Sequence, residues 1–84
     1  MKKIEFSKHA LLRMKVRGAT KEEVELAIRM GEIVSVKQNR IGFRKNFDFH
    51  NYWKGKFYKI KQVIPIVAEE IDKYIVVTVY TFYF

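Results

Sequence analysis

The hydrophobic pattern of the chain changes at Gly31. Before Gly31, apolar residues recur every three or four positions, as in Val24, Ala27 and Ile28, which is typical of an amphipathic helix. After Gly31, apolar and polar positions alternate, as in 33–36, which is typical of β-strands. The pattern therefore predicts helices in the first part of the chain and strands in the rest.

Both predicted helices have start and stop signals. Ser7 is a typical N-cap for a helix over 8–17, and Gly18 ends that helix because glycine readily adopts the left-handed conformation found there. Residues 20–23 read Thr-Lys-Glu-Glu, a capping box that begins a second helix, and Gly31 ends it.

Extended segments account for most of the remaining chain. They are expected at 4–6, 33–36, 41–47, 57–68 and 74–84. The polar and aromatic residues 48–55 are expected to form a loop. Pro65 marks a bulge or an edge strand, because proline cannot donate a hydrogen bond to a neighbouring strand.

The segment 74–84 is the strongest strand prediction. Regular alternation places Val76 and Tyr80 on one face and Val77 and Val79 on the other. Both faces are largely apolar, so we expect a central strand.

The order of these elements predicts a fold of the α+β class. We expect two N-terminal helices packed on a four-stranded antiparallel sheet. The whole chain, 1–84, is short enough to form a single domain.

Composition excludes several classes of protein. The chain has no cysteine, so it has neither a disulfide scaffold nor a thiolate nucleophile. Its two histidines lack a spaced set of acidic residues, and we expect no metal site and no cofactor. No stretch is apolar enough for a signal peptide or a membrane span, so we expect a soluble, cytoplasmic protein without membrane contacts.

The net charge of +8 on 84 residues points to an acidic partner. Nucleic acid fits best, RNA before DNA. The alternative is a lysine-rich solvated surface of the kind found in thermophiles. Such an ion-pair surface balances lysine with glutamate, whereas this chain has 12 Lys and 7 Glu.

One side of the first predicted helix carries a row of cations. At 100° per residue, His9, Arg13 and Arg17 form one stripe, while Lys8 and Lys15 lie nearly opposite. The stripe is flanked by apolar residues, so we expect it to face the rest of the protein or a cleft. Two explanations stay open: pairing with Glu5, Glu23 or Asp48, or binding of phosphate, which suits the guanidinium fork.

His9 lies in the first turn of this helix, where the helix dipole disfavours a positive charge. Arg13, one turn along, acts in the same direction. Both effects favour the neutral imidazole, which can act as a general base. The alternative is an ordinary packed or capping histidine.

The middle of the chain combines basic and aromatic residues. Between 37 and 61 there are eight basic residues and one acidic residue. Cations for the phosphates and rings for the bases are what single-stranded nucleic acid requires. Phe43, Phe47 and Phe57 can equally be core residues. The predicted nucleic-acid-binding residues are Arg40, Arg44, Lys45, Tyr52, Trp53 and Lys54, with Tyr52 and Trp53 at an exposed tip.

Several of these residues form a motif with fixed spacing. They are Phe6-Ser7, His9-Ala10, Arg13-Met14, Arg17 and the ending Thr78-Val79-Tyr80. The pattern resembles the small prokaryotic family catalogued as domain-of-unknown-function family 4258. That family in turn resembles the RelE-like toxin ribonucleases in architecture, which implies a RelE/barnase-like fold. It also implies that His9, Arg13, Arg17 and Tyr80 are candidate catalytic residues.

The leading functional hypothesis is a metal-independent endoribonuclease of toxin type. His9 takes a proton from a ribose 2′-OH, Arg13 and Arg17 stabilise the phosphate, and Tyr80 or a lysine protonates the leaving oxygen. The alternatives are a non-catalytic RNA- or DNA-binding module, or a basic partner of an acidic, antitoxin-like protein. We expect a monomer or a small homo-oligomer.

Overall fold

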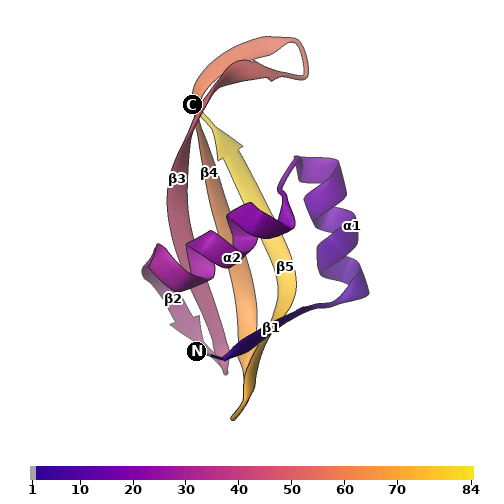
Figure 1. Cartoon of the computed structure of the whole chain (residues 1–84), viewed down its shortest axis with the longest axis vertical. Coiled ribbons are helices and arrows are strands. Elements are labelled where there is room, and N and C mark those ends of the chain that lie inside the picture. The colour runs from indigo at the N-terminus through magenta and orange to yellow at the C-terminus, as the bar shows by residue number, and fades with distance from the viewer. Residues whose placement is uncertain (1) are drawn as a thin grey trace.

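A computed structural model describes residues 2–84 of the chain (Figure 1). It contains two helices and five strands. In chain order they are β1 (Lys3–Phe6), α1 (Lys8–Arg17), α2 (Lys21–Met30), β2 (Glu32–Lys37), β3 (Arg40–Trp53), β4 (Lys56–Glu69) and β5 (Lys73–Tyr83). Strands therefore dominate the fold, and the α+β class is confirmed.

The predicted helix ends are confirmed. The Ser7 hydroxyl accepts a hydrogen bond from the Ala10 amide at 3.0 Å, and Gly18 adopts the left-handed conformation with φ of 79°. In the capping box before α2, the Glu23 amide donates to the Thr20 hydroxyl at 3.1 Å and the Thr20 amide donates to the Glu23 carboxylate at 3.0 Å. Each bond satisfies a backbone or side-chain group that the helix terminus leaves unpaired.

The predicted four-stranded antiparallel sheet is wrong. The sheet has five strands in the order β1-β5-β4-β3-β2, and β1 pairs with β5 in parallel, with Ile4 beside Tyr74 and Phe6 beside Val76. The other neighbours are antiparallel. The short segment before α1 thus completes the sheet from the opposite end of the chain and makes it mixed.

The predicted packing of both helices on such a sheet is also wrong. In Figure 1, α2 crosses one face of the sheet, where it contacts β3 and β4, whereas α1 lies beside β5. Pairing with β1 ends at Val76, and α1 follows the edge of β5 beyond that point. The Ser7 hydroxyl donates to the Val77 carbonyl at 3.4 Å, and the Arg17 guanidinium donates to the Val79 carbonyl at 2.7 Å. These donors take the place of a neighbouring strand, so the arrangement differs from the RelE/barnase-like one expected.

The predicted loop over residues 48–55 is wrong as well, because β3 continues to Trp53. A two-residue turn, Lys54–Gly55, with φ of 52° and 84°, connects it to β4. Positive φ at both positions is typical of the type I′ turn of tight hairpins. The β3–β4 hairpin is therefore long, and in Figure 1 its end curls over the top of the molecule.

Three bulges interrupt the pairing of the antiparallel strands. They fall between Ile33 and Ser35 in β2, between Asp48 and Asn51 in β3, and opposite Ile66 and Val67 of β4. The prediction that Pro65 marks a bulge or an edge strand is wrong, because Pro65 pairs with Val79 in regular register and β4 is an interior strand.

The bulge in β5 corrects the predicted faces of that strand. Val76 and Val79 are both fully buried, so they lie on the same side in spite of their odd spacing. The extra residue is Val77, because Ile66 pairs with Thr78 while Val67 pairs with Val76. From Thr78 onward, the face that carries Tyr80 is therefore opposite to the one that carries Val76.

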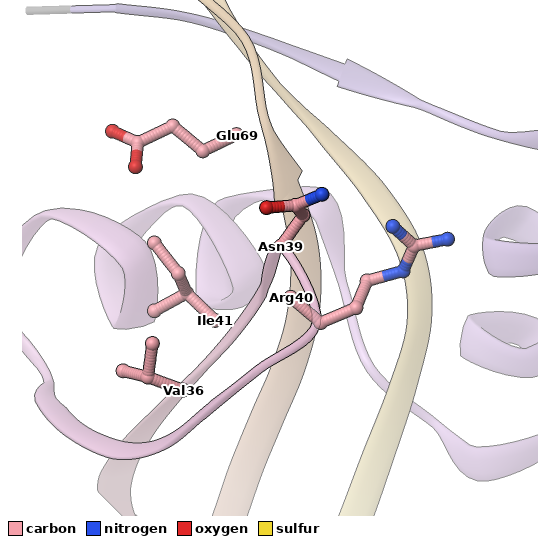
Figure 2. Close-up of a pocket in the computed structure, with 5 residues that line it drawn as sticks. All are labelled: Val36, Asn39, Arg40, Ile41 and Glu69. Carbon is pink, nitrogen blue, oxygen red and sulfur yellow. The ribbon is translucent and has the colours of Figure 1, made fainter.

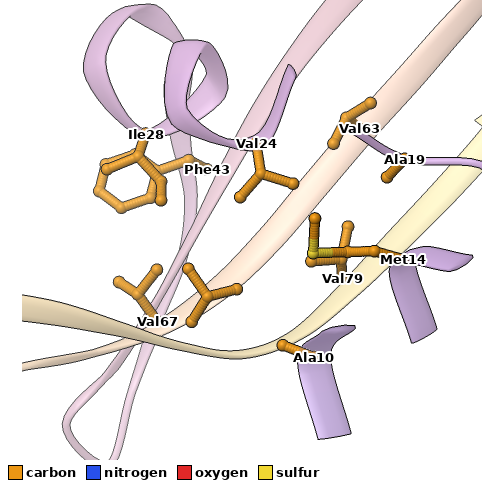
Figure 3. Close-up of a cluster of buried hydrophobic side chains, with 10 residues drawn as sticks. Ala10, Met14, Ala19, Val24, Ile28, Phe43, Val63, Val67 and Val79 are labelled. Carbon is orange, nitrogen blue, oxygen red and sulfur yellow. The ribbon is translucent and has the colours of Figure 1, made fainter. Parts of the chain in front are cut away.

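The hydrophobic core lies between α2, one side of α1 and the adjoining face of the sheet (Figure 3). The helices supply Ala10, Met14, Val24 and Ile28, and the strands supply Phe43, Val63, Val67, Val76 and Val79. The prediction that Phe43 is a core residue is confirmed, whereas Phe57 is exposed. Since the core occupies one face of the sheet, the other face is available for function.

Candidate nucleic-acid interface

His9 and Arg13 contact each other on the exposed side of α1. The Arg13 Nε donates to the His9 Nε2 at 3.4 Å, and both side chains are solvent-exposed. The pair therefore places an imidazole next to a guanidinium on the solvent side of α1.

Arg17 is half-buried at the C-terminal end of α1, where it reaches around the edge of β5. Besides its bond to the Val79 carbonyl, its Cζ lies 4.9 Å from the centre of the Tyr80 ring, a cation–π arrangement. The structure thus joins His9 to Arg13 and Arg17 to Tyr80, as two pairs along one side of α1. Tyr80 is 44% exposed.

Two of the three carboxylates considered as partners for this stripe pair elsewhere, and the third, Asp48, forms none of the ion pairs found in residues 2–84. Glu23 pairs with Lys61 at 2.8 Å, and Glu5 pairs with Lys73 at 3.4 Å. Within residues 2–84, neither Arg13 nor Arg17 lies within ion-pair distance of a carboxylate. Two guanidinium groups are therefore left for an anion from outside the chain.

The side of the sheet away from the core, which we call the open face, carries aligned rows of side chains. Strand register and alternation place on it Arg44, Asn46 and Asp48 of β3, Ile60, Gln62, Ile64 and Ile66 of β4, and Thr78, Tyr80, Phe82 and the following Phe84. The Gln62 amide donates to the Asn46 side-chain oxygen at 2.9 Å across this face. Phe82 and Phe84 are 47% and 63% exposed, so three neighbouring aromatic rings border solvent.

Residues 40–45 of the predicted nucleic-acid-binding set lie along the first part of β3. Arg44 forms an ion pair with Glu32, its Nε donating at 2.8 Å. The Lys45 ammonium lies 5.3 Å from the centre of the Phe47 ring. Arg40 is exposed beside the β2–β3 turn. Of these three, Arg44 has a carboxylate partner within the chain.

The remaining three members, Tyr52, Trp53 and Lys54, lie at the end of the β3–β4 hairpin. Tyr52 is 68% exposed, as expected of a tip. Trp53 is not at an exposed tip: its ring is half-buried and stacks on Tyr83, with centroids 5.1 Å apart and planes 14° apart. The Lys54 ammonium lies 5.6 Å from the centre of the Trp53 ring. The Trp53 indole, which was predicted to stack on a nucleic-acid base, thus packs against Tyr83 of β5 instead.

Lys61 and Tyr83 were missed as structural residues. Lys61 is 5% exposed, and its ammonium donates to the Glu23 carboxylate and to the Gly18 carbonyl. The Tyr83 hydroxyl donates to the Arg17 carbonyl at 2.8 Å, and burial raises the pKa of this phenol above its ordinary value. Both side chains secure the end of α1, and a charge count could not separate the buried Lys61 from exposed lysines.

Phe82 and Phe84 were missed as candidate binding residues. Their alternate spacing with Tyr80 is visible in the sequence, but their exposure depends on the bulge at Val77 and on α1 lying at the sheet edge. Neither feature has a local sequence signal.

Other possible sites lie away from the stripe. A pocket of about 220 Å³ is formed at the β2–β3 turn, and one of about 240 Å³ lies on the surface of α2. Over residues 2–84, no three His, Asp or Glu side chains gather closely enough to hold a metal ion. Neither α1 nor α2 is long and apolar enough to cross a membrane.

Together, a mixed sheet with one uncovered aromatic face and a flanking helix with unpaired arginines define a small basic α+β domain with a candidate anion site. Comparison with known families places it more closely. The profile described as "Domain of unknown function (DUF4258)" matches residues 6–81, and the chain belongs to this family. No curated protein and no solved structure matches the chain.

Proposed function

We propose that the protein binds single-stranded RNA across the open face of its sheet. The observation that carries this proposal is the row of exposed rings, Tyr80, Phe82 and Phe84, with Arg17 over the first ring. Neither Arg17 nor Arg13, one turn earlier on α1, has a carboxylate partner within residues 2–84. A net charge of +8 favours a polyanion over an apolar ligand.

The spacing of the rings suits a chain of bases. Alternate residues of a strand are about 6.8 Å apart, twice the rise per residue, so each ring can receive a separate base. Stacking of a base on an aromatic side chain contributes about 1–3 kcal/mol. Arg17, at the Tyr80 end of this row, and Arg13, one turn away on α1, can hold the phosphates that join such bases.

The amides of Asn46 and Gln62 support RNA as the preferred strand. They share a hydrogen bond beside Phe82, and each keeps further donor and acceptor capacity. Such groups can bond base edges and the ribose 2′-OH, the group that distinguishes RNA from DNA. We place this activity in the cytoplasm. An acidic protein that covered Arg13 and Arg17 would compete with RNA.

Substitution of one ring tests the open face. Phe82→Ala should weaken binding of a fluorescent single-stranded RNA about 5- to 150-fold, the range expected for loss of one stacked base. The matched control is Phe57→Ala, because Phe57 is 45% exposed, close to the 47% of Phe82. Phe57 lies at the end of the β3–β4 hairpin, next to its turn, and away from the row of Tyr80, Phe82 and Phe84. Fluorescence anisotropy gives both affinities, and circular dichroism confirms folding.

The reverse pattern would relocate the site. If Phe57→Ala weakens binding and Phe82→Ala does not, RNA lies on the hairpin with Tyr52, which contacts Phe57 with ring centroids 5.5 Å apart. Equal affinity of both variants and the wild type would mean that stacking on Phe82 or Phe57 does not contribute to RNA binding. A DNA oligonucleotide of the same sequence measures the preference for ribose.

The second candidate function is metal-independent cleavage of the bound RNA. It is favoured by the contact between His9 and Arg13, because a neutral imidazole beside a guanidinium can accept the proton of a 2′-OH near a phosphate. The 2′-oxygen would then attack phosphorus, and the P–O5′ bond would break. The products are a 2′,3′-cyclic phosphate and a 5′-hydroxyl, whose proton comes from Tyr80 or a lysine.

His9→Ala separates the two functions. If His9 is the base, this substitution should lower the cleavage rate about 10²- to 10⁴-fold and leave RNA affinity nearly unchanged. The assay follows a quenched RNA in EDTA, with an oligonucleotide that lacks the reacting 2′-OH as control. If the wild-type protein binds this RNA but does not cleave it, the cleavage function is ruled out and only the binding function remains.

A further inference from the structure

The strand β2 forms an edge of the sheet that no other element of the described chain pairs with. It is the last strand in the order β1-β5-β4-β3-β2, and all six of its residues are exposed. Ile33 and Val36 are 61% and 71% exposed in spite of being apolar. An exposed apolar edge of this kind is a template for a further strand.

The bulge in β2 sets the directions of its side chains. A Cβ placed on Gly42 would lie 3.3 Å from the Ser35 Cβ and 3.6 Å from a Val34 methyl group, so Val34 and Ser35 lie on the same face. Ile33 and Val36 are on the other face, since they pair with Phe43 and Ile41, which pack in or against the core. In a regular strand, residues three apart point to opposite faces.

This arrangement makes β2 complementary to itself. When two copies of Glu32–Lys37 run antiparallel about an axis between Val34 and Ser35, Glu32 lies opposite Lys37 and Ile33 opposite Val36. Each pair then lies on one face of the joined sheet, which the bulge alone allows. Opposite charges and apolar pairs directly across two strands are the stabilising combinations.

We propose that two copies of the chain associate through antiparallel pairing of their β2 strands. The pairing joins two five-stranded sheets into one continuous sheet and covers Ile33 and Val36 of each copy. Because the axis is perpendicular to the sheet, both open faces lie on the same side of the dimer.

The pocket at the β2–β3 turn lies beside this interface. Val36 and Ile41 form its apolar wall (Figure 2), on the face where the Ile33 of the second copy arrives. A methyl-bearing side chain from the second copy can therefore pack there. An acidic peptide fits the strand less well than a second copy, because it would place like charge opposite Glu32.

Charge reversal tests the pairing. Sedimentation velocity of the RNA-free wild type at neutral pH should show a monomer–dimer equilibrium. Lys37→Glu should raise the dimer Kd about tenfold or more, because two attractive pairs become repulsive. Glu32→Lys should act likewise, although it also removes the Arg44 pair. An equimolar mixture of the two variants should recover a heterodimer with affinity near that of the wild type.

The matched control is Lys59→Glu, which makes the same change of net charge on an exposed residue of β4 and should leave the Kd unchanged. Val36→Lys, at a side chain 71% exposed, should abolish the dimer without affecting folding. A wild type that stays monomeric at millimolar concentration overturns the proposal. So does a mixture that associates no better than its two components, because recovery requires this register.

Discussion

Arg17 connects the two sides of the sheet through different atoms. Its carbonyl accepts hydrogen bonds from the hydroxyls of Thr81 and Tyr83, at 2.8 Å each, on the side that bears the core. Its guanidinium binds the Val79 carbonyl and lies over Tyr80, on the open face. The hydroxyls fix the backbone of Arg17, so the side chain at the candidate site is held by residues that cannot themselves touch a ligand on the open face.

Tyr83 should make stability depend on alkaline pH. Burial raises the pKa of its phenol above the ordinary value of about 10, so folding favours the neutral form. Below pH ~10 the phenol is protonated in both states, and its contribution is complete. As the pH rises further, the unfolded phenol ionises first, so the free energy of unfolding falls until the folded pKa is passed.

Urea titrations between pH 8 and 11.5 measure this dependence. Tyr83→Phe should give a shallower alkaline loss of the free energy of unfolding than the wild type, because the ionising group is gone. Tyr52→Phe is the control, since Tyr52 is 68% exposed. If the free energy of unfolding depends on pH equally in the wild type and in Tyr83→Phe, folding does not raise the pKa of the Tyr83 phenol.

Among the elements, the β3–β4 hairpin and α1 depend on close contact at Gly18. A Cβ on Gly18 would lie 2.7 Å from the Tyr83 hydroxyl and 2.8 Å from the Trp53 ring. The hairpin end thus packs directly on the backbone where α1 stops. Trp53 stacks between this backbone and Tyr83, and this packing holds the hairpin end against α1.

Two glycine substitutions separate backbone strain from this packing. Gly18→Ala and Gly55→Ala both place alanine at positive φ, 79° and 84°, but a Cβ on Gly55 meets no atom within 4 Å. Gly55→Ala should cost about 1–2 kcal/mol from conformation alone. Gly18→Ala should cost about 2–5 kcal/mol, since overpacking adds to the strain. Thermal and urea unfolding compare them, and equal losses would mean that the hairpin end does not press on α1.

The sequence predicts the helices well because their end signals are local: Ser7, Gly18 and the Thr20–Glu23 box act within one turn. It fails where long-range pairing decides. Residues 48–53 look like a loop, yet β4 holds them in a strand, and nothing near Ile4 indicates that its partner is Tyr74.

The candidate site is predictable to a similar extent. Helical periodicity aligns His9, Arg13 and Arg17 on α1, and the first two are in contact. Regular alternation, however, assigns Val76 and Tyr80 to one face, and the bulge at Val77 separates them. A single inserted residue reverses every later assignment in the strand, so the open face could not be derived from the period alone.

At the scale of the whole molecule, the basic residues differ in whether they form ion pairs within the chain. Lys61 and Arg44 are paired within the chain, while Arg13, Arg17, Arg29 and Arg40 form none of the ion pairs found in residues 2–84. The net charge of +8 therefore does not show where cations are left for an external anion. Arg13 and Arg17 of α1 are among those cations.

RNA binding should depend strongly on salt. With about three phosphates neutralised, the logarithm of the association constant should fall by about 2 per tenfold increase in salt. Arg13→Gln should reduce this slope by about 0.7, because one phosphate contact is lost. Arg29→Gln, an exposed arginine of α2, should keep the wild-type slope. Anisotropy titrations from 50 to 500 mM salt measure the slopes, and identical slopes for wild type and Arg13→Gln would place the phosphates elsewhere.

The parallel pairing of β1 with β5 also has a consequence for how the molecule is made. Lys3 pairs with Lys73, and almost the whole domain lies between them in the chain. The hairpins β2–β3 and β3–β4 join neighbouring segments and can form early, whereas closing so long a loop is slow. During translation, β1 leaves the ribosome first but must wait for β5, so a nascent chain carries an unfinished sheet until synthesis has passed Val76.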